Sequence, residues 1–126
     1  MRSEERKKSL GEVFTPTKLV AKMLKQLPEE VWIDTQKTFC DPTCGNGNFL
    51  VAVVKLKLVN ATPLQALSTT YGVDIMQDNV DEARERMLVV CEKTSGQQRT
   101  LEWIETVNRN IVCHDALTYH WKFDGT

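Results

Sequence analysis

The sequence lacks the features that mark several classes of protein. Its 126 residues contain no apolar run that approaches the roughly 18 residues of a membrane-spanning helix, and no signal peptide is recognisable. There are 16 Lys and Arg residues against 17 Asp and Glu residues, so the formal net charge is -1. This balance excludes the strongly basic surface that is typical of a stand-alone nucleic-acid-binding domain. We expect a cytoplasmic protein that has no membrane partner.

Residues that commonly bind metal ions are few. The sequence has 2 His residues, and the spacing of Cys40, Cys44, Cys91 and Cys113 matches no zinc-binding pattern. Three of these cysteines lie within apolar segments, as is typical of small buried thiols. The sequence therefore predicts no metal site, and it favours a reducing compartment.

Apolar periodicity and turn residues predict alternating helices and strands after a polar tail at residues 1–10. Apolar residues at helical spacing, with threonine or proline at several starts, predict helices at 14–27, 48–60, 63–68, 78–93 and 100–107. Short apolar segments predict strands at 37–41, 70–75 and 110–117. This alternation predicts a single α/β domain over residues 1–126, with a parallel sheet and right-handed crossovers.

An acidic residue stands at or near the end of each predicted strand. These residues are Asp41, Asp74 and Asp115. Ligands of open parallel sheets bind beyond the carboxyl ends of the strands. Three acids in this position predict a ligand that carries several hydroxyl and amine donors.

The first predicted strand is followed by a glycine turn, Cys44-Gly45-Asn46-Gly47. Glycines allow positive φ and close approach of a ligand, and the helix that follows presents free amides. The dinucleotide-binding pattern is incomplete because Leu50 occupies the place of its third glycine, and no Gly-Lys-Ser/Thr follows as in a phosphate-binding loop. A tight strand-to-helix turn without any ligand would explain the same glycines.

The acids and the turn together favour an amino acid joined to a nucleoside. Asp41 would accept from its ammonium group, while the helix amides would meet its carboxylate. Asp74 would accept from the ribose hydroxyls, Ile75 would pack on the purine, and Asp115 would accept from the exocyclic amine. S-adenosylmethionine and its product S-adenosylhomocysteine have this structure.

Four blocks of sequence resemble the N6-adenine DNA methyltransferases of restriction-modification systems. They are GEVFTPTKLVAKML, DPTCGNGNFL, GVDI and HDAL, within residues 11–119. The likeness is closest to members that place the FTP motif at the N-terminus, including type I modification subunits. The resemblance implies a three-layer Rossmann-like methyltransferase fold with strand order 3-2-1, truncated after the third parallel strand.

The resemblance also implies a set of residues that bind S-adenosylmethionine or S-adenosylhomocysteine. They are Phe14, Thr15, Pro16, Asp41, Thr43, Gly45, Gly47, Asp74, Ile75, Asp115, Ala116 and Leu117. The first three would cover the methionine end of the cofactor, and the next four would form the turn around it. The remaining five would hold the ribose and the adenine.

A motif of this family is missing. Its members carry (Asn/Asp/Ser)-Pro-Pro-aromatic after the fourth strand, where it orients the target amine and stacks on the flipped base. The prolines here, Pro16, Pro28, Pro42 and Pro63, are never adjacent, and none follows the third predicted strand. We therefore expect no catalytic residue in this chain and no DNA methylation by the chain alone.

Several explanations fit a chain with only the cofactor half of a methyltransferase. It could be a fragment of a longer enzyme, one part of a split enzyme, or a short derivative that binds the cofactor or a partner for another purpose. A different reaction of the same cofactor, such as its cleavage, is a further option. It could also be a non-catalytic interaction or anti-restriction protein, of phage origin for example, built on a methyltransferase remnant.

The incomplete sheet predicts an assembly. The first strand would lie at a sheet edge with little protection against pairing, because it contains no proline. The missing strands should also leave apolar surface on Val53, Val54 and Leu56. We expect a homo-oligomer, most simply a dimer, or a second chain that completes the methyltransferase. DNA would be contacted only through such an assembly.

Overall fold

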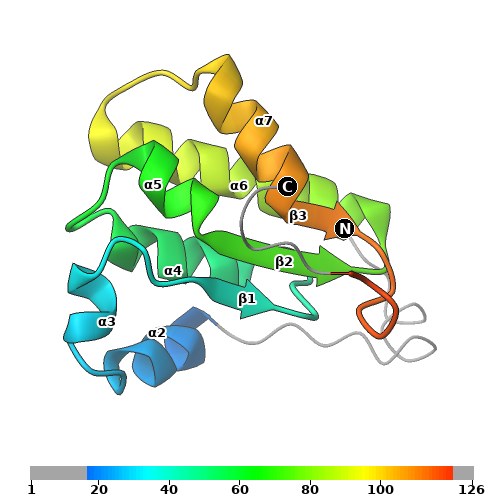
Figure 1. Cartoon of the computed structure of the whole chain (residues 1–126), viewed down its shortest axis with the longest axis horizontal. Helices are drawn as coiled ribbons and strands as arrows, with labels where there is room; N and C mark the ends of the chain where they lie inside the picture. Colours follow the sequence, from blue (N-terminus) through cyan, green and yellow to red (C-terminus); the bar gives the residue numbers. More distant parts are fainter. Residues whose placement is uncertain (1–16, 121–126) are drawn as a thin grey trace.

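A parallel sheet with packed helices forms residues 17–120, the part of the chain that the computed structural model describes (Figure 1). The strands are β1 (Phe39–Asp41), β2 (Thr70–Asp74) and β3 (Ile111–Cys113). The helices are α2 (Thr17–Lys25), α3 (Glu30–Ile33), α4 (Asn48–Lys57), α5 (Pro63–Ser68), α6 (Gln77–Ser95) and α7 (Leu101–Asn110). Each predicted helix and strand is present, and α3 is an additional short helix. The third strand is shorter than predicted, because β3 ends at Cys113 and Asp115 lies in the turn that follows. None of the helices in residues 17–120 is long and apolar enough to cross a membrane.

The sheet has the order β1-β2-β3, with β2 in the centre and parallel neighbours on both sides. Phe39 pairs with Thr70 and Asp41 with Gly72, while Gly72 also pairs with Ile111 on the opposite side. The predicted Rossmann-like α/β fold and its 3-2-1 strand order are therefore confirmed. This register brings the carboxyl ends of the three strands to the same end of the sheet.

Helix α4 lies between α2 and α6 and packs against β1 and β2, while α5 packs against α7 (Figure 1). Gly72 in the central strand allows the close approach of α4. A Cβ atom at this position would lie 2.8 Å from the Cδ1 atom of Leu50. A larger residue would push α4 away from the sheet and disturb the packing between them.

The predicted apolar stripe of α6 is confirmed. Val80, Ala83, Met87, Leu88 and Cys91 are all buried, together with side chains of α4, α5, α7 and β3. Their spacing of three or four residues keeps them on one side of the helix. This stripe holds α6 against the rest of the core and so fixes its first turns near the ends of the strands.

The expected apolar surface on α4 was a wrong prediction. Val53 and Val54 are fully buried, Val53 beneath α2 and Val54 in the main core. Leu56 is half-buried against the small cluster that Val53 forms with α2. Helix α2 covers this side of α4, so α4 does not need a second molecule to hide these side chains.

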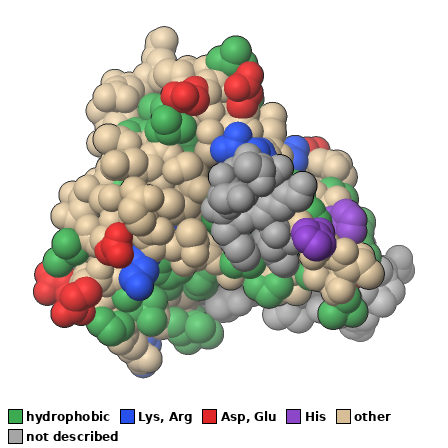
Figure 2. Space-filling view, viewed as in Figure 1, with side chains coloured by type: hydrophobic (Ala, Val, Ile, Leu, Met, Phe, Trp, Pro, Cys, Tyr) green, Lys and Arg blue, Asp and Glu red, His purple; other side chains and the backbone are tan. Residues whose placement is uncertain are grey.

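Helix α2 buries less of its predicted apolar face than its sequence pattern indicates. Val20 and Leu24 are buried, but Leu19, Met23 and Leu27 remain 49%, 50% and 38% exposed. The reason is that α2 packs mainly against α4, so only a narrow stripe of its surface is covered. Apolar side chains accordingly appear on the molecular surface around α2 and α3 (Figure 2).

A buried lysine links the end of α4 to the start of β2. Lys57 is 6% exposed, and its Nζ atom donates to the Thr69 carbonyl, the Thr69 hydroxyl and the Thr70 hydroxyl at 2.8, 2.7 and 2.9 Å. The two hydroxyls in turn donate to the carbonyls of Gln65 and Ala66. Three acceptors thus match the three donors of an ammonium group. The apolar pattern of residues 48–60 gives no sign of this arrangement.

The burial of Lys57 makes stability depend on pH. Removal from water lowers the pKa of Lys57 from 10.5 to about 7. Between these values the unfolded chain binds a proton that the folded chain has released. The free energy of unfolding should therefore increase as the pH rises above 7.

We expect an increase of up to about 1 kcal/mol per pH unit between about pH 7 and pH 8.5, measured by urea denaturation. The window stops there because burial raises the pKa of Cys40, Cys44 and Cys91, that of Cys91 to about 12, which has the opposite effect at higher pH. The Lys57→Met variant, which keeps much of the side-chain volume, should lack the increase. An equal pH dependence in both proteins would contradict this role for Lys57.

Candidate binding site

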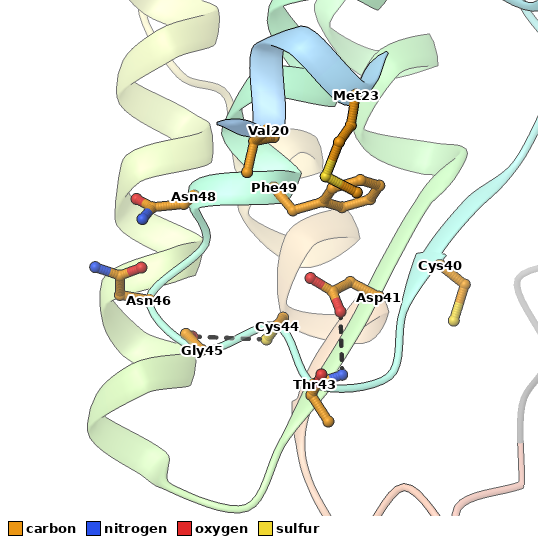
Figure 3. A pocket seen from close by; sticks show the side chains of 10 residues that line it. All are labelled: Val20, Met23, Cys40, Asp41, Thr43, Cys44, Gly45, Asn46, Asn48 and Phe49. Carbon is orange, nitrogen blue, oxygen red and sulfur yellow. Dashed lines mark hydrogen bonds between the residues drawn. The ribbon is translucent and has the colours of Figure 1, made fainter. Parts of the chain in front are cut away.

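A cavity of about 210 Å³ lies between α2, the end of β1 and the start of α4 (Figure 3). Its lining residues are Val20, Met23, Cys40, Asp41, Thr43, Cys44, Gly45, Asn46, Asn48 and Phe49. The structure therefore brings three of the predicted site residues together, Asp41, Thr43 and Gly45. Pockets for drug-sized ligands measure roughly 300–1,000 Å³. This cavity can hold one end of such a ligand, and the rest must lie outside it.

The glycine turn has the backbone conformation that its sequence predicts. Gly45 and Gly47 have φ values of 52° and 92°, in the left-handed region that glycine adopts without steric cost. The Gly47 amide donates to the Cys44 carbonyl at 2.9 Å, and the Cys44 amide donates to the Val73 carbonyl at 2.8 Å. These bonds close the turn and attach it to β2.

Gly47 serves close packing and does not line the cavity. It is buried, and a Cβ atom built on it would lie 2.9 Å from the Cβ atom of Ala83 in α6. The turn therefore approaches α6 as closely as a residue without a side chain allows. Of the two predicted glycines, Gly45 faces the cavity and Gly47 faces the helix behind it.

The three strand-end aspartates share a structural role that the sequence did not reveal. Each side chain accepts a hydrogen bond from the backbone amide two residues later: Asp41 from Thr43 at 3.1 Å, Asp74 from Met76 at 3.0 Å, and Asp115 from Leu117 at 2.9 Å. This local bond is typical of aspartate in turns. An acid at a strand end thus helps to turn the chain, whether or not a ligand is bound.

Asp74 makes further contacts that connect the site. Its Oδ1 atom accepts from the Gly45 amide at 3.2 Å, and its Oδ2 atom accepts from the side-chain amide of Asn79 at 2.8 Å. Asn79 is fully buried on the same side of α6 as Ala83 and Met87. This contact was not predicted, although an asparagine on the apolar stripe of a helix is a sequence signal for it.

Negative charge is concentrated beside the cavity. Burial raises the pKa of Asp41, the Thr43 amide lowers it, and the nearby charge of Asp74 raises it further. Burial and the same carboxylates hold the pKa of the Cys44 thiol well above its usual range. A bound cationic group would relieve the repulsion between Asp41 and Asp74.

The other predicted site residues lie on a more open surface. Ile75 is 67% exposed and Leu117 is 94% exposed, while Asp115 is exposed and Ala116 is half-buried. None of these four residues lines the cavity. The ends of β2 and β3 are nevertheless adjacent, because the His114 amide donates to the Asp74 carbonyl at 3.0 Å. Phe14, Thr15 and Pro16 lie outside the described residues.

The acidic side chains beside the cavity are bonded to amide groups. Among residues 17–120, no three or more His, Cys, Asp or Glu side chains are grouped so that they could hold a metal ion. The acids beside the cavity are engaged instead by backbone and side-chain amides.

Comparisons with known proteins bear on this site. Residues 1–110 match the family model described as N-6 DNA Methylase. The Type II methyltransferase M.VspI of Vibrio sp. (strain 343) is 34% identical over 91 residues, which cover 71% of this chain and 19% of that protein. The chain therefore matches about a fifth of the length of this relative. No solved structure gives a significant match.

The close packing of Gly47 can be tested separately from its left-handed backbone. Gly47→Ala should lower the free energy of unfolding by about 2–4 kcal/mol, because it adds strain at positive φ and a clash with Ala83. Gly96→Ala is the matched control, since Gly96 has a φ of 73° and open space around it. It should cost about 1–2 kcal/mol. Equal losses in urea denaturation would show that the contact with Ala83 is unimportant.

Proposed function

This chain belongs to the N-6 DNA methylase family, and we propose that it is the S-adenosylmethionine-binding part of a site-specific DNA adenine-N6 methyltransferase. The observation that carries the proposal is the cavity beside the glycine turn, with Asp41 and Gly45 in its lining. It lies at the carboxyl end of β1, where open parallel sheets bind their ligands. When bound, this cofactor supplies an activated methyl group.

The cavity suits the amino-acid end of the cofactor. Asp41 would accept from the ammonium group, which would also offset the burial and the repulsion from Asp74 that raise its pKa. The cavity, with a volume of about 210 Å³, is too small to hold the nucleoside as well. The nucleoside would therefore extend over the open surface at the ends of β2 and β3.

Asp74 is placed to meet the ribose at the start of that surface. A carboxylate has about four acceptor positions, and three donors already occupy Asp74: the amides of Gly45 and Met76 and the side chain of Asn79. About one position is left for a ribose hydroxyl. The exposed side chain of Ile75, next in the chain, offers an apolar contact for the adenine ring.

The target base must be handled by residues other than these. The family motif that orients the target amine contains two adjacent prolines, and no two prolines are adjacent in this sequence. We propose that this function comes from residues outside the range 1–126, either on a longer chain or on a second one. The described residues would then bind and orient the cofactor without transferring its methyl group.

The free edge of β1 is the proposed place for an additional strand or a second copy of the chain. The Phe39 amide donates to the Thr69 carbonyl of the neighbouring segment. The amide of Cys40, one residue later, therefore points to the opposite side of β1. No described residue pairs with that side of the strand. An edge of this kind favours pairing with another strand.

The first prediction from the proposed function concerns the charge of Asp41. Asp41→Asn keeps an oxygen that can accept from the Thr43 amide, so the turn should be preserved while the charge is lost. We expect calorimetry to show binding of S-adenosylhomocysteine weakened by about 1.5–3 kcal/mol. The thermal stability should equal or exceed that of the wild-type chain, because the burial and repulsion that raise the pKa of Asp41 disfavour its charge. Binding is the measurement because we expect no methyl transfer to DNA by this chain alone.

Asp34→Asn is the matched control, since Asp34 accepts from the Gln36 amide in the same way and does not line the cavity. It should leave the affinity unchanged. If the wild-type chain gave no heat with S-adenosylmethionine or S-adenosylhomocysteine at millimolar concentration, the proposed function would be refuted. An undiminished affinity of Asp41→Asn would refute only the role of Asp41.

The second prediction concerns assembly at β1. Light scattering coupled to size exclusion should give a mass above that of the monomer at high micromolar concentration, most simply that of a dimer. Cys40→Pro should shift the protein to the monomer, because it removes the outward amide and leaves the bonds to β2 in place. A sharp monomer peak from the wild-type chain would rule out self-pairing.

A further inference from the structure

Arg86 in α6 contacts the glycine turn from the side opposite to Asp41. Its Nη1 atom donates to the backbone carbonyl of Asn46 and to the side-chain oxygen of Asn48, both at 2.8 Å. Both asparagines also line the cavity, and Figure 3 shows them across the turn from Asp41. The guanidinium group therefore lies directly behind the lining of the site.

The contact with Asn46 fixes one peptide group in particular. The peptide that joins Asn46 to Gly47 has its carbonyl held by Arg86 and its N–H held by the Cys44 carbonyl. The two groups point in opposite directions, so the two bonds together set the orientation of the peptide plane. Gly47, with a φ of 92°, would otherwise allow this plane to rotate at little steric cost.

The orientation of this peptide matters for the shape of the cavity, because Asn46 belongs to its lining. In the observed conformation, the partial negative charge of the Asn46 carbonyl is directed at a cation in α6. A rotated peptide would turn that oxygen away from Arg86 and break the bond from Gly47 to Cys44. The Asn46 carbonyl would then point toward the Cys44 carbonyl, so the turn would lose both bonds and leave the conformation that shapes the lining of the cavity.

We propose that Arg86 is a positioning residue that holds the glycine turn in the conformation that binds the cofactor. For its ligand this inference rests on the proposed function, but the conformation of the turn is a property of the free protein. Loss of Arg86 lets the turn populate other conformations. The apparent affinity for the cofactor then falls in proportion to the fraction of molecules whose turn keeps the conformation that binds it.

Arg84 supplies a matched control on the same helix. Its Nε atom donates to the Ile111 carbonyl at 2.7 Å and its Nη2 atom to the Asn108 carbonyl at 3.2 Å. Like Arg86, it holds backbone carbonyls of a neighbouring segment. Its hydrogen-bond partners belong to the end of α7 and the start of β3, and none of them is a residue of the glycine turn.

The experiment compares Arg86→Ala, Arg86→Lys and Arg84→Ala with the wild-type chain. Amide hydrogen exchange of Gly47, followed by NMR without ligand, reports the orientation of the peptide. Calorimetry with S-adenosylhomocysteine reports affinity. In the Arg86→Ala variant we expect the amide hydrogen of Gly47 to exchange about tenfold faster than in the wild-type chain. We also expect this variant to bind S-adenosylhomocysteine about tenfold more weakly. The exchange rate and the affinity of Arg86→Lys should lie between those of Arg86→Ala and the wild-type chain, because lysine keeps the charge but not the planar donor pair.

Arg84→Ala should lower the denaturation midpoint while leaving Gly47 exchange and the affinity close to wild type. The proposal is overturned if Arg86→Ala leaves Gly47 exchange unchanged, or if Arg84→Ala raises it equally. If Arg86→Ala did not fold, Arg86→Lys would decide the question by the same two measurements. A wild-type chain that binds no cofactor would refute the proposed function, and the exchange of Gly47 would still test the role of Arg86.

Discussion

The carboxylate of Asp74, at the end of β2, joins this strand to the glycine turn and to the start of α6, the segments on which the candidate site depends. It accepts from the glycine turn through Gly45, from the start of α6 through Met76, and from the buried side chain of Asn79. Gly45 and Asp74 are distant in sequence, and the parallel register of β1 and β2 brings them together. The conformation of the turn therefore depends on correct strand pairing, and a bond to a charged group stabilises it more than a neutral one would.

The hydrogen bonds of the three aspartates change how acids at the ends of the strands are interpreted. Each of the three aspartates accepts from an amide two residues later, so each has a reason to be present without a ligand. Asp41 lines the cavity and Asp74 lies behind its glycine turn, whereas Asp115 is exposed on the open surface. The support for a cofactor therefore comes mainly from Asp41 and Asp74, together with the family to which the chain belongs.

The order of helices and strands could be predicted because it depends on local patterns. The apolar stripe of α6 and the positive φ of Gly45 and Gly47 follow from residue type and spacing alone. The buried ammonium group of Lys57 could not be predicted, because its acceptors lie in another segment, at Thr69 and Thr70.

The cover of Val53 by α2 was missed for the same reason. The packing of one helix on another is not encoded in the periodicity of either helix. Local sequence therefore specifies the elements and the shape of the turn. The contacts that hold the turn in place come from residues that are distant in sequence, and only the three-dimensional structure reveals them.

One face of α6 forms the support behind the glycine turn. Asn79, Ala83 and Arg86 are spaced by four and three residues, so they lie in line along the helix. The first fixes the carboxylate of Asp74, the second packs against Gly47, and the third holds the Asn46 carbonyl. None of the three lines the cavity. The shape of the site thus depends on the rotation and position of α6, and the apolar stripe of that helix sets both through its packing in the core.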